Sequence, residues 1–89
     1  MVYLVSYDLK GGNPEDYGEL YDLFATFSDC KKCLESSWLV VTDMSCEQVR
    51  DRLRTKMNPA DLIVVVPYGP MRSSWIPTDV VDWIHKYMP

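Results

Sequence analysis

Residues 1–9 constrain the fold of this chain more than any other stretch. They are mostly β-branched, aromatic or aliphatic, a composition that is typical of a strand. Successive side chains of a strand point to opposite faces, so Tyr3 and Val5 share one face, whereas Leu4 lies on the other. Because both faces are apolar, the stretch predicts a central strand in a sheet that is covered on two sides.

The rest of the chain alternates between helical and strand periodicity. Pro14 suits the first turn of a helix, and Ser45 forms a capping-box pattern with Gln48. After the first strand, the predicted elements are a helix over 14–28, strands over 30–34 and 36–42, a helix over 45–57, a strand over 62–66 and a short helix from 77 onward. The order predicts an α+β protein, a ferredoxin-like βαββαβ sandwich with a short C-terminal helical extension. We expect one domain over residues 1–89, with its core in 1–68 and the extension in 69–89.

Two helices cover only one face of such a sheet, and the second face needs another cover. The strand over 62–66 is apolar on both faces, like the first strand. A second copy of the chain, stacked sheet on sheet, would cover this face, and we therefore expect a homodimer. The alternative is a monomer whose C-terminal helix folds across the sheet. In both cases we expect the apolar tail side chains to dock, either on the domain body or on a partner chain, namely Trp75, Ile76, Trp83 and Ile84.

Composition limits the classes of function. A net charge of -4 and a pI of about 4.7 disfavour broad electrostatic binding to nucleic acid. No apolar run approaches the roughly 20 residues of a membrane helix, and no signal-peptide pattern is visible at the N-terminus. We therefore expect a cytoplasmic protein with no membrane partner.

Basic residues cluster around one predicted helix. Arg50 and Arg54 lie one turn apart, and Lys31 and Lys32 add to the patch if the fold brings them near. These four side chains are the candidate contacts to nucleic-acid phosphates. The alternative is a solvated helix face, in which nearby acids dilute the positive charge.

Cys30 and Cys33 have the C-x-x-C spacing of some metal and redox sites. A structural zinc site needs about four ligands, and only Cys46 and His85 remain as soft candidates. Redox cysteines usually begin a helix, whereas this pair follows one. Reduced thiols along a strand edge are the preferred interpretation.

Two segments resemble a known family. Residues 5–9 (VSYDL) and 35–42 (ESSWLVVT) resemble the Cas-two family of CRISPR-associated proteins, most closely its stand-alone, SinR-like relatives. The similarity extends over about residues 1–68, and the tail from Trp75 to Trp83 resembles that of the same relatives. It implies a ferredoxin-like homodimer with the first-strand aspartates near the twofold axis. It also implies either metal-dependent nuclease activity or a structural, nucleic-acid-binding role in spacer integration, with the family's catalytic aspartate at Asp8.

Asp8 has two interpretations. In the first it is the catalytic residue and metal ligand, and two chains share Mg²⁺ or Mn²⁺, which would lower the pKa of a bound water. In the second its carboxylate accepts hydrogen bonds from the Gly11-Gly12 turn. The residues alone leave both open, so the sequence does not decide whether the protein is an enzyme, which would be a divalent-metal-dependent phosphodiesterase or endonuclease.

The predicted function is that of a Cas-two-like small dimeric protein that binds nucleic acid or a partner from the CRISPR or defence machinery. Metal-dependent endonuclease activity is a further option that depends on Asp8. The alternative is a non-catalytic acidic protein-interaction module of mobile-element or phage origin.

Overall fold

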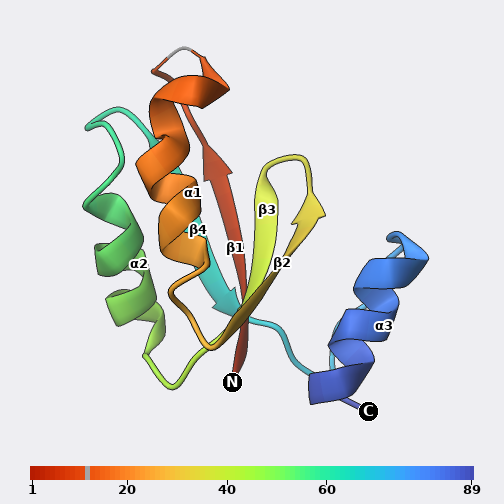
Figure 1. The fold of residues 1–89 in the computed structure, drawn as a ribbon. Coiled ribbons are helices and arrows are strands. Elements are labelled where there is room, and N and C mark those ends of the chain that lie inside the picture. Colours follow the sequence, from red (N-terminus) through yellow and green to blue (C-terminus); the bar gives the residue numbers. More distant parts are fainter. Residues whose placement is uncertain (12) are drawn as a thin grey trace.

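A four-stranded antiparallel sheet forms the centre of the computed structural model, which describes residues 1–11 and 13–89 (Figure 1). The elements are β1 (Val2–Asp8), the 3-10 turn η1 (Pro14–Tyr17), α1 (Gly18–Phe24), β2 (Asp29–Leu34), β3 (Ser37–Val41), α2 (Cys46–Arg54), β4 (Leu62–Pro67) and α3 (Thr78–Tyr87). The strand order is β2-β3-β1-β4, so β1 is central as predicted and β4 lies at an edge. The α+β class is confirmed. Within the described residues, no helix has the length and apolar character that crossing a membrane requires.

Helices α1 and α2 cover the first face of the sheet (Figure 1). Phe24 of α1 stacks on Trp38 of β3, with ring centroids 4.5 Å apart and planes 11° from parallel. Val49 and Leu53 of α2 are fully buried in the same core. The buried residues of this face are Tyr3, Val5, Tyr17, Leu20, Phe24, Phe27, Val40, Val49 and Leu53. Tyr3 and Val5 therefore face this core, as the alternation in the first strand predicts.

Helix α3 packs on the second face, beside β2 and β3 (Figure 1). Its buried Val80, Trp83 and Ile84 contact Val2 and Leu39. The C-terminal helix therefore covers part of this face, as the monomeric alternative predicts.

Three of the four apolar tail side chains dock on the domain body, and the fourth does not dock within the chain. Trp83 and Ile84 are buried, and the half-buried Ile76 packs against the same cluster. Trp75 is 100% exposed. The apolar stripe of α3 begins only at Val80, and in the preceding loop Ile76 takes the inward position while its neighbour Trp75 points outward.

Two helices are shorter than predicted. The helix predicted over 14–28 is divided into η1 and α1 and ends at Phe24, and α2 ends at Arg54 instead of residue 57. Single turns prolong both ends, because the amide of Phe27 donates to Phe24 and that of Met57 donates to Arg54. The apolar side chains beyond the helix ends therefore still reach the core. The predicted capping box at the start of α2 is confirmed.

Candidate functional site

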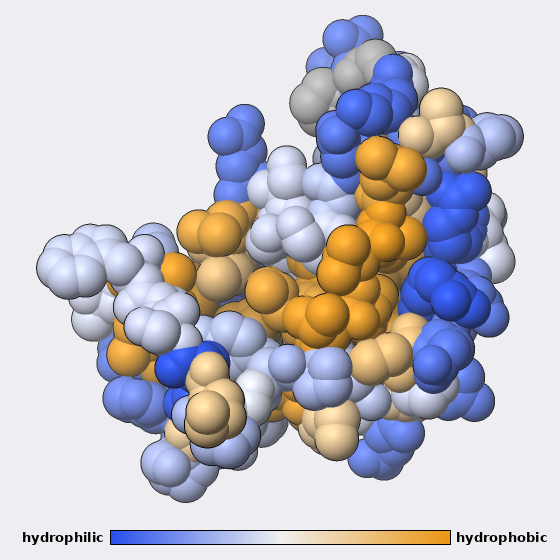
Figure 2. Space-filling view, turned by 180° about the vertical axis from the view of Figure 1, so that it is seen from behind, coloured by the Kyte–Doolittle hydropathy of each residue, from blue (hydrophilic) through white to orange (hydrophobic). Residues whose placement is uncertain are grey.

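The part of the second face that α3 does not cover is apolar and exposed. Leu62, Val64 and Val66 of β4 are 59%, 58% and 41% exposed. They lie opposite Asp8, Ser6 and Leu4 of β1, and directly paired residues share a face. We call these six residues, Leu4, Ser6, Asp8, Leu62, Val64 and Val66, the open face. From behind the view of Figure 1, a continuous hydrophobic area bordered by hydrophilic residues occupies this side of the molecule (Figure 2).

Edge position explains this exposure. Ile63 and Val65 of β4 point to the first face and pack against its core. Val64 and Val66 point to the second face, where α3 lies beside β2 and β3 at the other side of the sheet. Both faces of residues 62–66 are therefore apolar, as predicted. Within one chain the side chains on the first face are covered, whereas those on the second face are exposed.

Asp8 lies at the end of the open face and is exposed. Its carboxylate forms an ion pair with the Lys10 ammonium at 2.7 Å, in which both side chains are at least half exposed. Such a pair contributes about 0 to 1 kcal/mol to stability. The capping interpretation of Asp8 is wrong for Gly11, whose amide donates to the hydroxyl of Tyr17 at 2.9 Å. The other residue of that predicted turn, Gly12, lies outside the described residues.

Asp61 is the carboxylate that holds this turn, and the sequence reasoning missed it. It is 5% exposed, and its oxygens accept hydrogen bonds from the amides of Lys10 and Asn58, both at 2.7 Å, and from the Tyr17 hydroxyl at 3.0 Å. Burial acts to raise the pKa of Asp61, but these hydrogen bonds and the charge of Arg54 together hold it below its ordinary value. The sequence offers one signal for this role: Asp61 ends the turn that begins with Asn58 and Pro59, directly before a predicted strand.

The surroundings of Asp8 within one chain do not fit a divalent metal. Among the residues that the structure describes, no three His, Cys, Asp or Glu side chains lie close enough together to hold an ion. The ammonium of Lys10 already neutralises the Asp8 carboxylate. A metal ion at Asp8 would therefore have to displace Lys10 and take its other ligands from water, from a substrate or from a second chain.

The two predicted phosphate-binding lysines point to opposite faces of β2. Lys31 forms an ion pair with Asp79 of α3 at 2.9 Å. Lys32 borders a cavity of about 330 Å³ whose lining also includes Asp8 and Glu35. Lys31 is therefore paired with a carboxylate, and Lys32 borders the same cavity as two others.

The two predicted phosphate-binding arginines are also engaged within the chain. Arg50 pairs with its exposed neighbour Asp51 at 3.0 Å. Arg54 donates to the backbone carbonyls of Asn58 and Asp61 at 3.0 and 3.3 Å. The two lysines lie on opposite faces of β2, and the two arginines lie on α2. The fold therefore does not bring the four basic side chains into one patch.

Cys30 and Cys33 are separated by the sheet. Cys30 packs against the core under α1 and α2, whereas Cys33 packs against the cluster under α3. An odd spacing along a strand places side chains on opposite faces, which explains the separation. Partial burial raises the pKa of both thiols, so neither is an activated thiolate. The geometry favours the interpretation that these cysteines serve in packing.

Comparisons with models of protein families, with curated proteins and with solved structures found no match. The candidate site is therefore defined by geometry: an apolar open face on β1 and β4 with Asp8 at its rim.

Proposed function

We propose that the protein is a ferredoxin-like homodimer of the Cas-two type, that it acts as a non-catalytic binding module in the cytoplasm, and that the open face is its dimer interface. The β-α-β-β-α-β order, with α1 and α2 on one face, supports the ferredoxin-like fold. One observation carries the proposal: the aliphatic side chains of Leu62, Val64 and Val66 remain 41–59% exposed, because α3 covers only the other side of that face.

A second copy of the chain is the occupant that suits the open face best. Two identical sheet faces can stack around a twofold axis, and burying each half-exposed aliphatic side chain would contribute about 1 kcal/mol. The centre of the surface is uncharged, and its rim carries both a carboxylate and an ammonium, from Asp8 and Lys10. Twofold symmetry would allow each carboxylate to face the partner's ammonium. A nucleic acid is disfavoured as the occupant, because phosphates need cations that this face lacks.

The experiment is to place a charge in the centre of the open face. Sedimentation equilibrium at micromolar concentration should give twice the chain mass of 10.3 kDa for the wild type, and the chain mass for Val64→Asp. The buried carboxylates would lack partners in a dimer, which is costly. Circular dichroism checks that the variant is folded.

Leu34→Asp is the matched control. Leu34 is 53% exposed, close to the 58% of Val64, but it lies on β2 at the opposite edge of the sheet. This variant should remain a dimer. A wild type that sediments as a monomer would defeat the proposal, and so would equal dissociation by both substitutions.

A metal-dependent nuclease is the second candidate function, and the position of Asp8 favours it. Asp8 lies on the open face beside Leu62, so a dimer formed through this face would carry both carboxylates at its interface. Mg²⁺ or Mn²⁺ would then rely on water and substrate phosphates for its remaining ligands. Metal-dependent cleavage of RNA or DNA that is abolished by chelator and by Asp8→Asn would favour this candidate over the binding module.

A further inference from the structure

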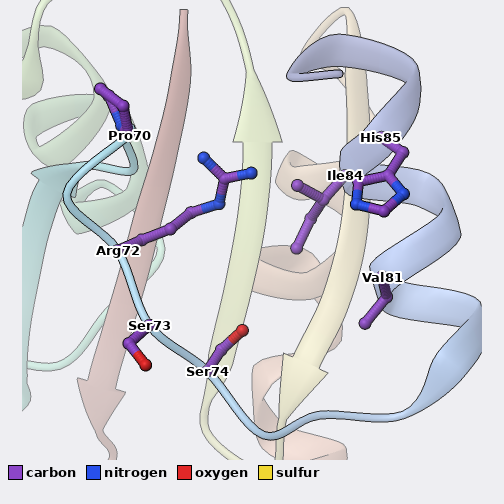
Figure 3. Close-up of a pocket in the computed structure, with 7 residues that line it drawn as sticks. All are labelled: Pro70, Arg72, Ser73, Ser74, Val81, Ile84 and His85. Carbon is purple, nitrogen blue, oxygen red and sulfur yellow. The ribbon is translucent and has the colours of Figure 1, made fainter.

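The loop between β4 and α3 forms a pocket together with α3. Its lining comes from the loop residues Pro70, Arg72, Ser73 and Ser74 and from Val81, Ile84 and His85 of α3, and its volume is about 310 Å³. Small-molecule sites occupy roughly 300–1,000 Å³, so this pocket suits a small ligand. Figure 3 shows the guanidinium of Arg72 extending from the loop toward Ile84 and His85 on the facing helix.

Arg72 is held in place with most of its donors unused. One guanidinium nitrogen donates to the carbonyl of Gly69 at 3.2 Å, and the group lies over the ring of Tyr68, 5.5 Å from its centroid. Among the described residues, no carboxylate lies within ion-pair distance of Arg72, in contrast to Lys10 and Lys31. An arginine has five N–H donors in a planar fork, so several remain for a ligand.

The other polar groups of the pocket suit an anion. Ser74 supplies a hydroxyl that Figure 3 shows directed from the loop toward the facing helix, and His85 supplies an imidazole that donates through at least one nitrogen. None of the described residues that line the pocket is acidic, although the chain has 13 Asp and Glu against 9 Lys and Arg. Val81 and Ile84 add an apolar side to the pocket, against which an organic group would pack.

We propose that this pocket binds a phosphate dianion, either free or as a monoester, through Arg72, Ser74 and His85. Arginine forks match the geometry of phosphate oxygens, and charge-assisted hydrogen bonds are the strongest of this type. The inference does not require the homodimer, because one chain supplies all the residues that line the pocket.

A titration followed by proton NMR tests the proposal. His85 is the only histidine of the chain, so its imidazole protons give an isolated signal. Inorganic phosphate, added at constant pH and constant ionic strength against chloride, should shift this signal saturably. Phenyl phosphate is the second probe: tighter binding than phosphate would identify a monoester as the preferred source of the dianion, and weaker binding would identify the free ion.

Arg72→Gln should weaken the affinity by roughly tenfold or more, the effect of losing a charge-assisted contact. Arg52→Gln is the control, because Arg52 lies on α2 outside the pocket, where its guanidinium donates to Thr26, and it should leave the affinity unchanged. The absence of saturation with either probe into the tens of millimolar would overturn the proposal. Equal affinity in wild type and Arg72→Gln would overturn it too.

Discussion

Two carboxylates near the exit of β1 have opposite environments. Asp61 is buried and accepts hydrogen bonds from three donors, whereas Asp8 is exposed and pairs with one flexible ammonium. Asp61 therefore joins three separate segments: the loop after β1, the turn η1 through Tyr17, and the turn before β4 through Asn58. The chemistry of the site at Asp8 depends on this scaffold, because the loop that carries Lys10 is fixed by Asp61.

Asp61→Ala should lower the free energy of unfolding by about 2 to 4 kcal/mol, because it leaves the amides of Lys10 and Asn58 and the hydroxyl of Tyr17 without their acceptor. Urea denaturation followed by circular dichroism measures the change. Asp8→Ala is the control and should cost at most about 1 kcal/mol, since it removes only an exposed ion pair. Similar losses in the two variants would contradict the role given to Asp61.

The contribution of Asp61 to the free energy of unfolding should decrease at low pH. The pKa of Asp61 is lower in the folded chain than in the unfolded one, where an aspartate titrates near 3.9. The contribution of Asp61 is therefore fully present above about pH 4 and is lost as the pH falls through the folded pKa. The difference in stability between wild type and Asp61→Ala should shrink over that acidic range.

At the scale of elements, one carboxylate on β2 fastens α3 to the sheet. Asp29 accepts hydrogen bonds from the indole of Trp83 at 3.2 Å and from the hydroxyl of Tyr87, and Lys86 lies 4.0 Å away. The hydrogen bond from Tyr87 is the main cause that lowers the pKa of Asp29, against the opposing effect of burial. The tail is therefore held both by its apolar stripe and by this charged contact.

Asp29→Asn should loosen α3 without unfolding the sheet, at a cost of about 1 kcal/mol. The indole N–H of Trp83 reports the loosening of α3, because its hydrogen exchange with solvent should become faster. Proton NMR measures this exchange rate. Because the folded pKa of Asp29 is lowered, the wild type should show the same loosening as the pH falls below about 4. Asp82→Asn, an exposed change on the same helix, should leave the exchange unchanged. A protected indole in Asp29→Asn would show that the apolar stripe alone holds the tail.

Side-chain periodicity predicted which residues share a face, but it could not predict which strand is at an edge. The alternation that separates Tyr3 and Val5 from Leu4 is confirmed, because the period of 2 is a local property of the chain. The exposure of Val64 depends instead on strand order and on where α3 lies, which are set by long-range contacts. The same holds for Asp61, whose donors at Lys10 and Tyr17 are 51 and 44 residues away in the chain.

At the scale of the whole molecule, positive charge is dispersed and largely neutralised. The net charge is -4, and among the residues that the structure describes, five basic side chains form ion pairs with carboxylates. Binding to a nucleic-acid backbone draws its affinity from cations that neutralise phosphates and release counterions. An acidic surface of this kind offers few such cations in one place, which agrees with a protein partner for the proposed module.

We therefore expect only weak binding to nucleic acid, with a Kd above roughly 10⁻⁴ M, the upper end of non-specific binding, even at low salt. Fluorescence anisotropy with labelled single-stranded and duplex oligonucleotides measures it. Their ends should carry hydroxyl groups, so that a terminal phosphate does not occupy the pocket of Arg72. If binding were instead micromolar, fell steeply with salt and was lost in Arg50→Gln or Lys32→Gln, the four predicted basic residues would form a functional surface in the dimer. In that case the partner of the module would be nucleic acid. A single chain keeps these basic side chains apart, so their joint effect on binding would show that the assembly of two chains brings them together.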